Sequence, residues 1–253
     1  MKIQLASDLH LELEKNSNYI KDFPLIPCGN ILILAGDIGY IGHSTYDKHP
    51  FWDWASESFE RVLVVPGNKE FYRNFDLSEL KNGIKIEIRK NIHWYYNKSE
   101  TINGIEFIMT PLWSFIPASA ESSVKKIHPD FKFIRHNGEL LSIDIYNKLH
   151  NQCIEFLMTE LREKKGKRVI VSHHVPTLQC ISKEFKGDQM NCAFYSDMEK
   201  LIKRYNPDYW VYGHSHRNVG RLEIGKTVLL SNQLGYVNMF EQDGFDRSCC
   251  FII

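Results

Sequence analysis

The chain has 253 residues, of which 43% are hydrophobic and 25% charged, as is typical of a folded globular protein. Basic and acidic residues number 31 each, so the formal net charge is zero and gives no support to binding of nucleic acid or an anionic membrane. The sequence shows no secretory signal, no apolar run long enough to span a membrane and no CxxC pair among its six cysteines. We therefore expect a cytoplasmic protein with reduced thiols, folded as a single domain over residues 1–253.

Short runs of apolar, often β-branched residues recur along the chain, and each ends in polar residues. They lie at residues 3–6, 31–35, 62–65, 105–109, 169–171 and 209–212. Runs of this length without clean alternation predict strands that are buried on both faces.

Helical patterns lie between some of these strands. Residues 143–165 place apolar side chains at spacings of three and four, and Gly166 follows as a stop. Ser196 and Glu199 form a capping-box sequence for a helix that continues to about Tyr205, while residues 50–59 and 76–81 are weaker candidates. Alternation of strands and helices predicts an α/β fold. The β-rich residues 221–253 suggest a second sheet packed on the first.

The segment from about residue 114 to 141 fits neither the strand nor the helix pattern. It is rich in Phe, His, Ser and Lys. Two interpretations remain open: a cap or lid beside a functional site, and a plain surface excursion.

Side chains that commonly bind metals follow most of the predicted strands directly. In chain order they are Asp8 and His10, Asp37, Asn68, His173 and His174, and His214 and His216. Ligands of open α/β sheets bind at the carboxyl ends of strands, so we expect these side chains to meet. Mixed imidazole and carboxylate ligands suit Mn, Fe, Zn, Co or Ni better than Ca. The pattern predicts a transition-metal site.

The motifs around these residues occur in a characteristic order. They are Asp8-Leu9-His10, Gly36-Asp37, Gly67-Asn68-Lys69-Glu70, His173-His174-Val175-Pro176 and Gly213-His214-Ser215-His216. The series resembles the signature of the calcineurin-like metallophosphoesterase family, and residues 231–236 resemble the tail of many members. The resemblance implies a four-layer αββα sandwich with two central mixed sheets.

The resemblance also implies an enzyme: a binuclear metal-dependent phosphohydrolase that cleaves a phosphate mono- or diester by attack of metal-bound hydroxide. Two such ions, with Mn favoured in vitro, would clamp the attacking and leaving oxygens of a small phosphorylated substrate. The implied ligands are Asp8, His10 and His216 for one ion, Asn68, His173 and His214 for the other, and Asp37 bridging both. His173 is preferred to His174 because the family ligand usually comes first in the run before proline. His174 would then contact the phosphate or hold a neighbour in place.

Lys69 departs from the family pattern, in which a histidine follows Gly-Asn. A lysine ammonium can neutralise a phosphoryl oxygen as a point charge, but with its ordinary pKa of about 10.4 it is a poor general acid. We therefore predict that Lys69 binds the substrate phosphate and contributes little to proton donation; the alternative is that it points to solvent and another group supplies the acid. The departure also leaves a second class of function open, a binding or scaffold protein that keeps the fold without catalysis.

The remaining histidines lack a motif and are predicted to lie on the surface or in the core. They are His43, His49, His93, His128, His136 and His150. His43 follows the Gly36-Asp37 turn and His136 lies in the segment 114–141, so these two are the next candidates for a site.

Overall fold

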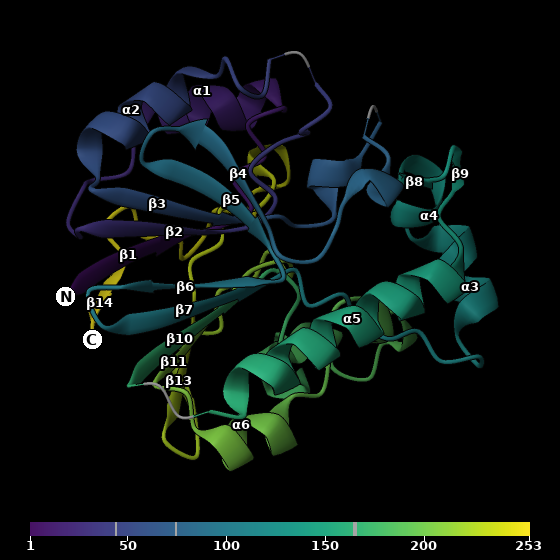
Figure 1. Cartoon of the computed structure of the whole chain (residues 1–253). Coiled ribbons are helices and arrows are strands. Elements are labelled where there is room, and N and C mark those ends of the chain that lie inside the picture. The colour runs from purple at the N-terminus through teal and green to yellow at the C-terminus, as the bar shows by residue number, and fades with distance from the viewer. Residues whose placement is uncertain (44, 74, 164–165) are drawn as a thin grey trace.

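The computed structural model describes residues 1–43, 45–73, 75–163 and 166–253. Two six-stranded sheets lie face to face, and helices cover the outer face of each (Figure 1). This arrangement confirms the predicted four-layer αββα sandwich with two mixed central sheets. Within the described residues, no helix is long and apolar enough to cross a membrane.

The first sheet has four parallel central strands with an antiparallel strand at each edge. The central strands are β1 (Lys2–Ala6), β2 (Ile31–Ala35), β3 (Arg61–Val65) and β5 (Ile92–Tyr96). The edge strands are β14 (Cys250–Ile252), beside β1, and β4 (Ile84–Arg89), beside β5. Its outer face carries α1 (Glu14–Asp22) and α2 (Pro50–Ser58) (Figure 1).

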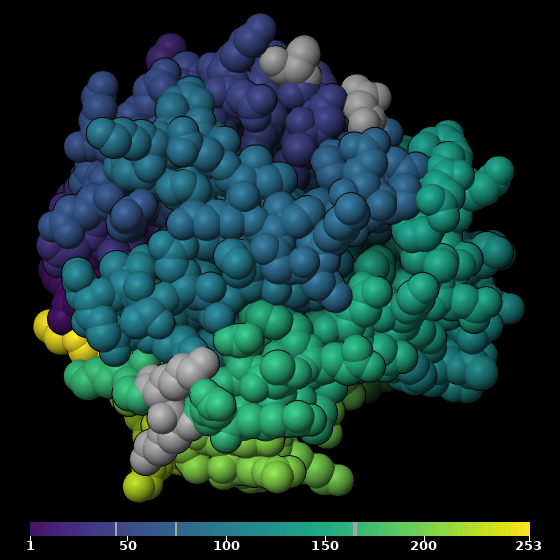
Figure 2. Space-filling view, viewed as in Figure 1, coloured from purple at the N-terminus to yellow at the C-terminus, as the bar shows by residue number. Residues whose placement is uncertain are grey.

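The second sheet repeats this plan. Its parallel strands are β7 (Ile105–Thr110), β10 (Lys167–Ser172), β11 (Tyr209–Tyr212) and β13 (Thr227–Ser231). The antiparallel edges are β6 (Lys98–Ile102) and β12 (Leu222–Ile224). Helices α5 (Ile143–Leu161) and α6 (Glu199–Tyr205) cover the outer face of this sheet (Figure 1). The two halves of the molecule, each a sheet with its helices, meet across the middle (Figure 2).

Burial on both faces explains why the strands show no clean alternation of apolar and polar residues. In β2, Ile31 and Ile33 face the core between the sheets. Leu32 and Leu34 face the opposite way, into the core beneath the helices. Each strand of this kind buries apolar side chains on both of its faces. This burial fixes the register of the strand and holds its carboxyl end in place.

The segment 114–141 forms α3 (Glu121–Ile127), α4 (Asp130–Phe133) and a small hairpin of β8 (Arg135–His136) and β9 (Glu139–Leu140). It lies to one side of the sandwich, beyond α5 (Figure 1). Backbone bridges from Tyr72 to Ile134 and from Asp76 to Arg135 join it to the loop that follows β3. Single turns of 3-10 helix between residues 178 and 193 precede α6.

Three predicted helix boundaries need correction. The helix expected from Ser196 begins at Glu199, because the Ser196 N–H donates to the Val175 carbonyl and Ser196 lies in an extended stretch beside that loop. The candidate at residues 76–81 is only a 3-10 turn, Leu77–Glu79. The long helix ends at Leu161, and the last two residues of its predicted range, 164 and 165, lie outside the described residues.

The sequence suggested that residues 221–253 form a second sheet packed on the first. In the structure these late strands are instead divided between the two sheets. Strands β12 and β13 extend the second sheet, whereas β14 returns to pair with β1 in the first. The amino group of Met1 donates to the Ile253 carbonyl at 2.7 Å, so the two ends of the chain lie together at the opposite ends of the strands from the ligand loops (Figure 1). All six cysteines are free.

Candidate metal centre

The loops after the parallel strands of both sheets bring the predicted ligands together. Asp8 and His10 follow β1, Asp37 follows β2, Asn68 follows β3, His173 follows β10, and His214 and His216 follow β11. All are buried except His216, which is partly exposed. Both sheets thus contribute from the carboxyl ends of their strands, as the α/β pattern led us to expect.

The ligand loops turn sharply, and several of their residues have the positive φ angles of such turns. Five of the seven residues have a positive φ: Asp8 (54°), His10 (47°), Asp37 (55°), His214 (78°) and His216 (50°). A side chain other than glycine in this left-handed region costs about 1 kcal/mol or more. Such strain gathered in one place is typical of a functional site, because packing elsewhere must maintain it.

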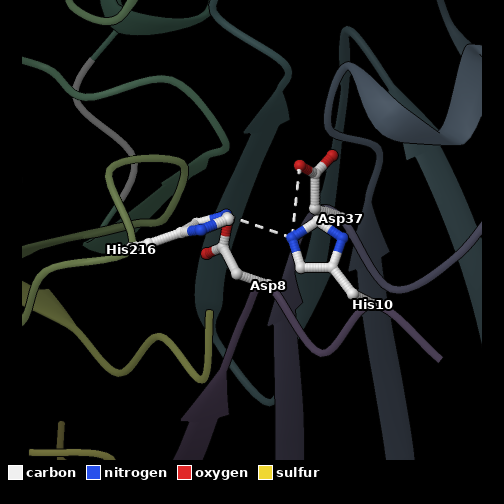
Figure 3. A group of neighbouring side chains, drawn as sticks. All are labelled: Asp8, His10, Asp37 and His216. Carbon is white, nitrogen blue, oxygen red and sulfur yellow. Dashed lines mark hydrogen bonds and ion pairs between the residues drawn. The ribbon is translucent and has the colours of Figure 1, made fainter. Parts of the chain in front are cut away.

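A first group of possible metal ligands comprises Asp8, His10, Asp37 and His216 (Figure 3). Their nearest nitrogen and oxygen atoms all lie within 4.8 Å of one another. The two imidazoles face each other, with Nε2 of His10 3.0 Å from Nε2 of His216. Oδ1 of Asp8 lies 3.3 Å from the latter nitrogen, and Oδ2 of Asp37 lies 3.9 Å from the former.

A second group comprises Asp37, His173 and His214, with Asn68 beside it. Nε2 of His173 lies 3.5 Å from Oδ1 of Asp37 and 3.0 Å from Nδ1 of His214. It also lies 3.1 Å from the Asn68 side-chain oxygen. Asp37 belongs to both groups, one carboxylate oxygen facing each.

Three of the four histidines of the two groups have an acceptor for the outer ring nitrogen, whereas Nε2 of His214 has no partner among the described residues. Nδ1 of His10 lies 3.2 Å from Glu12, and Nδ1 of His216 lies 2.7 Å from Glu241. Nδ1 of His173 lies 2.9 Å from the Ala35 carbonyl, which can only accept. A proton held on the outer nitrogen leaves the inner nitrogen with its lone pair, which is the form of histidine that binds metals. The donor set therefore fits transition-metal ions.

The charges of the first group also point to a cation. Burial and the nearby Asp8 carboxylate raise the pKa of Asp37 well above its usual value. Burial opposes ionisation of Asp8, but the hydrogen bond with His216 outweighs it and lowers the pKa of Asp8. Burial likewise opposes charging of His216, but its hydrogen bonds with Asp8 and Glu241 raise its pKa to about 9. His216 thus matches the charge of Asp8, whereas the buried carboxylate of Asp37 lacks a matching positive charge.

Glu70, the last residue of the Gly-Asn-Lys-Glu motif, holds two ligand loops together. Its buried carboxylate accepts hydrogen bonds from the backbone N–H groups of Asp37 (2.9 Å), Ile38 (2.6 Å) and Gly67 (2.7 Å). At Gly67, a Cβ atom would overlap both Oδ1 of Asp37 and the ring of His173. The motif therefore packs the loops closely enough for Asp37 to face both groups.

His173 and His174 point in different directions. His173 joins the second group, whereas both nitrogens of the fully buried His174 face other partners, the Pro111 carbonyl at 3.1 Å and the Tyr146 hydroxyl at 3.3 Å. Its ring lies against that of His214, with centroids 4.2 Å apart. His174 does not line the cavity described below, so its position supports the role of holding a neighbour and not that of contacting phosphate.

A cavity of about 390 Å³ opens beside the two groups. Asp37, Asn68, His214 and His216 line it on one side, together with Lys69. Ile127, His128 and Pro129 come from the segment 114–141, and Ile181, Phe185 and Phe194 come from the stretch before α6. A ligand of the two groups would thus have apolar walls around its remaining part.

Sequence reasoning missed several residues that support the ligands. Glu12 and Glu241 face His10 and His216, and Asp130 accepts from the Asn68 amide at 2.7 Å. Glu241 and Asp130 are remote in sequence from the ligands that they hold and carry no motif. Glu12 could have been suggested as a supporting residue from the sequence, because it lies two residues after His10.

Comparison with known proteins agrees with this geometry. A family model described as calcineurin-like phosphoesterase matches residues 1–218. The protein L509 of Acanthamoeba polyphaga mimivirus is 29% identical over 92% of this chain and 91% of its own length. The UPF0046 protein K07C11.7 of Caenorhabditis elegans is 22% identical over 91% of this chain and 69% of its own length.

Solved structures share the fold. The phosphopantetheinyl hydrolase PptH of Mycobacterium tuberculosis superposes with a TM-score of 0.68 at 17% identity, covering 96% of this chain and 92% of its own. A dimetal phosphatase of Danio rerio gives a TM-score of 0.52 at 12% identity, covering 92% and 87%. At these identities the likeness concerns the fold alone.

Proposed function

The chain belongs to the calcineurin-like phosphoesterase family, and we propose that it is a binuclear metal-dependent phosphohydrolase acting on a small phosphate mono- or diester. The observation that carries this proposal is the pair of ligand groups that share Asp37 at the edge of the cavity. We assign Asp8, His10 and His216 to one ion, Asn68, His173 and His214 to the other, and Asp37 to both.

When bound, two such ions supply a hydroxide nucleophile at neutral pH and charge stabilisation for the attacking and leaving oxygens. The protein's part is to hold the donors in place through Glu12, Glu70 and Glu241 and to exclude water with the apolar walls of the cavity. The mixed nitrogen and oxygen donors favour Mn, Fe, Zn, Co or Ni, and Mn is our choice for assays.

We expect purified protein loaded with Mn to hydrolyse p-nitrophenyl phosphate or bis-p-nitrophenyl phosphate and to lose this activity on chelation. Metal content should approach two equivalents per chain. A panel of phosphomonoesters, cyclic nucleotides, dinucleoside polyphosphates and phosphopeptides would then separate monoesterase from diesterase activity. Protein that binds two metals but hydrolyses none of these compounds would favour a binding or scaffold protein instead.

We propose that Lys69 binds the substrate phosphate. Its ammonium lies 4.4 Å from the centre of the Tyr72 ring and 5.9 Å from that of Tyr236, and both rings line the cavity. These cation–π contacts keep the charge at the cavity and speak against a side chain that points to solvent.

Lys69→Ala should raise KM about tenfold, the loss expected for one charge-assisted hydrogen bond, and change kcat less. Lys69→Arg keeps the charge and serves as the control, with a smaller rise in KM. Steady-state kinetics over a series of leaving groups tests the assignment. A KM that Lys69→Ala leaves unchanged for every ester would rule out phosphate binding by this residue.

We propose further that the segment 114–141 is a cap and not a plain surface excursion. It contributes Ile127, His128 and Pro129 to the cavity wall and places Asp130 against the ligand Asn68.

A further inference from the structure

One histidine outside the ligand set forms part of the cavity wall. His128 lies between α3 and α4 and is only 4% exposed. Its ring packs edge-on against Phe194, with centroids 5.5 Å apart. Phe194 in turn lies against the ring of His214, with centroids 4.8 Å apart. A single aromatic ring thus bridges His128 and the second ligand group.

A buried aspartate holds this histidine on the side away from the cavity. Oδ1 of Asp130 accepts from the Asn68 amide and the Tyr72 hydroxyl, each at 2.7 Å. Oδ2 of Asp130 is left without a hydrogen bond among the described residues and lies 3.5 Å from Nδ1 of His128. The backbone N–H of Asp130 points at the same nitrogen at 3.4 Å.

Before any proton transfer, this arrangement favours a proton on Nε2 of His128. When His128 is neutral and Nδ1 accepts from the backbone N–H, Nε2 carries the proton. When His128 is charged, Nδ1 faces the carboxylate and Nε2 again carries a proton. No hydrogen bond to Nε2 is formed within the described part of the chain, so this donor is free to meet a ligand in the cavity.

Three other polar side chains of the cavity wall, those of Tyr72, Tyr236 and Arg217, are poorly suited to donating a proton. The hydroxyl of Tyr72 is already bonded to Asp130, and burial raises the pKa of Tyr236. Arg217 is paired with Glu184 and does not lose its proton in proteins. An imidazole backed by a carboxylate is the side-chain pair most often used for proton transfer near neutral pH.

We propose that His128, positioned by Asp130, protonates the leaving-group oxygen, a role that rests on the proposed hydrolysis. A water-derived oxygen forms a new bond to phosphorus as the bond to the leaving oxygen breaks. The electron pair of that bond stays on the leaving oxygen, which takes the Nε2 proton from the charged imidazole. Proton transfer leaves the ring transiently neutral with its proton on Nδ1, facing Asp130, and uptake of a proton at Nε2 from solvent restores the charged form. His128 thereby supplies the proton that Lys69 is not expected to donate.

The test compares esters that differ only in the leaving group. His128→Ala should lower kcat for phenyl and alkyl phosphate esters about 10²-fold or more. It should leave turnover of the nitrophenyl ester nearly unchanged, because nitrophenolate departs without a proton. His136→Ala, in the same segment but outside the cavity, is the matched control and should affect neither ester. Adding Lys69→His to His128→Ala should recover part of the lost activity on the phenyl ester.

Two further measurements separate this role from a structural one. Metal content of His128→Ala should stay at the wild-type value, and calorimetry should show unchanged binding of inorganic phosphate, which has no leaving group. Loss of metal, weaker phosphate binding, or equal losses on all esters would overturn the proposal, as would an unchanged dependence on the leaving group. Wild-type protein that binds metal but cleaves none of these esters would instead contradict the proposed function itself.

Discussion

Replacing Asp37 by asparagine should abolish hydrolysis and remove the stabilisation that bound metal gives the fold. Asp37 is the one residue shared by both ligand groups, with Oδ1 facing His173 and Oδ2 facing His10. An amide offers one oxygen and no charge, so neither ion would keep its full set of ligands. Activity should fall about 10³-fold or more, since each ion contributes several kcal/mol to catalysis.

In the metal-free protein, the Asp37→Asn substitution should not destabilise the fold. Burial and the charge of Asp8 raise the pKa of Asp37, so ionising Asp37 above its unfolded pKa of about 3.9 destabilises the metal-free fold at neutral pH. The Asp37→Asn substitution removes that charge, and the amide oxygen can still accept from the Lys69 N–H, which donates to Oδ1 of Asp37 at 2.8 Å. The metal-free variant should therefore be at least as stable as the metal-free wild type.

Thermal unfolding with and without Mn checks both parts. At about 100 times its Kd a bound ion adds roughly 2.7 kcal/mol, which corresponds to several degrees in Tm for a chain of this size. Wild type should gain this increment and Asp37→Asn should not. Asp22→Asn, at the exposed end of α1, is the control and should behave as wild type. An equal gain of Tm in Asp37→Asn would contradict a bridging role.

Glu70→Ala should be the most destabilising single change in the ligand loops. Its carboxylate accepts from Asp37, Ile38 and Gly67, with Gly39 at 3.3 Å, and all of these groups are buried. Removing the acceptor leaves several buried N–H groups without a partner, at about 1 to 3 kcal/mol each. We expect a loss of about 3 kcal/mol or more in the free energy of unfolding, measured by urea denaturation of the metal-free protein.

Metal affinity should fall in the same variant, because the loops after β2 and β3 lose their common anchor. Glu79→Ala, in the exposed 3-10 turn nearby, removes a carboxylate that does not bond to these loops and should cost less than about 0.5 kcal/mol. If Glu70→Ala unfolded at the same urea concentration as Glu79→Ala, the anchoring role of Glu70 would be wrong.

The class of fold and the strands that carry the ligands could be predicted from the sequence alone. Runs such as residues 31–35 are apolar at every position because both faces of the strand are buried. Such a run can be recognised from a short stretch of sequence. The order of the motifs from Asp8 to His216 then indicated the family, which the match over residues 1–218 shows. The edge strand β4, with its exposed charges, lacks such a run and was missed.

The folded chain was needed to learn how the late strands divide between the sheets. The family pattern had favoured His173 over His174 as the ligand; the physical reason for the difference is tertiary, because the loop after β10 turns the ring of His173 toward Asp37 and that of His174 toward Tyr146. The same holds for Asp130 and His128. Asp130 meets Asn68, which lies 62 residues away in the sequence, and His128 reaches the cavity wall, because the segment 114–141 packs against the loop after β3. Side chains that act through such long-range contacts leave no periodic signal in the sequence, since nothing in their local spacing depends on the contact they make.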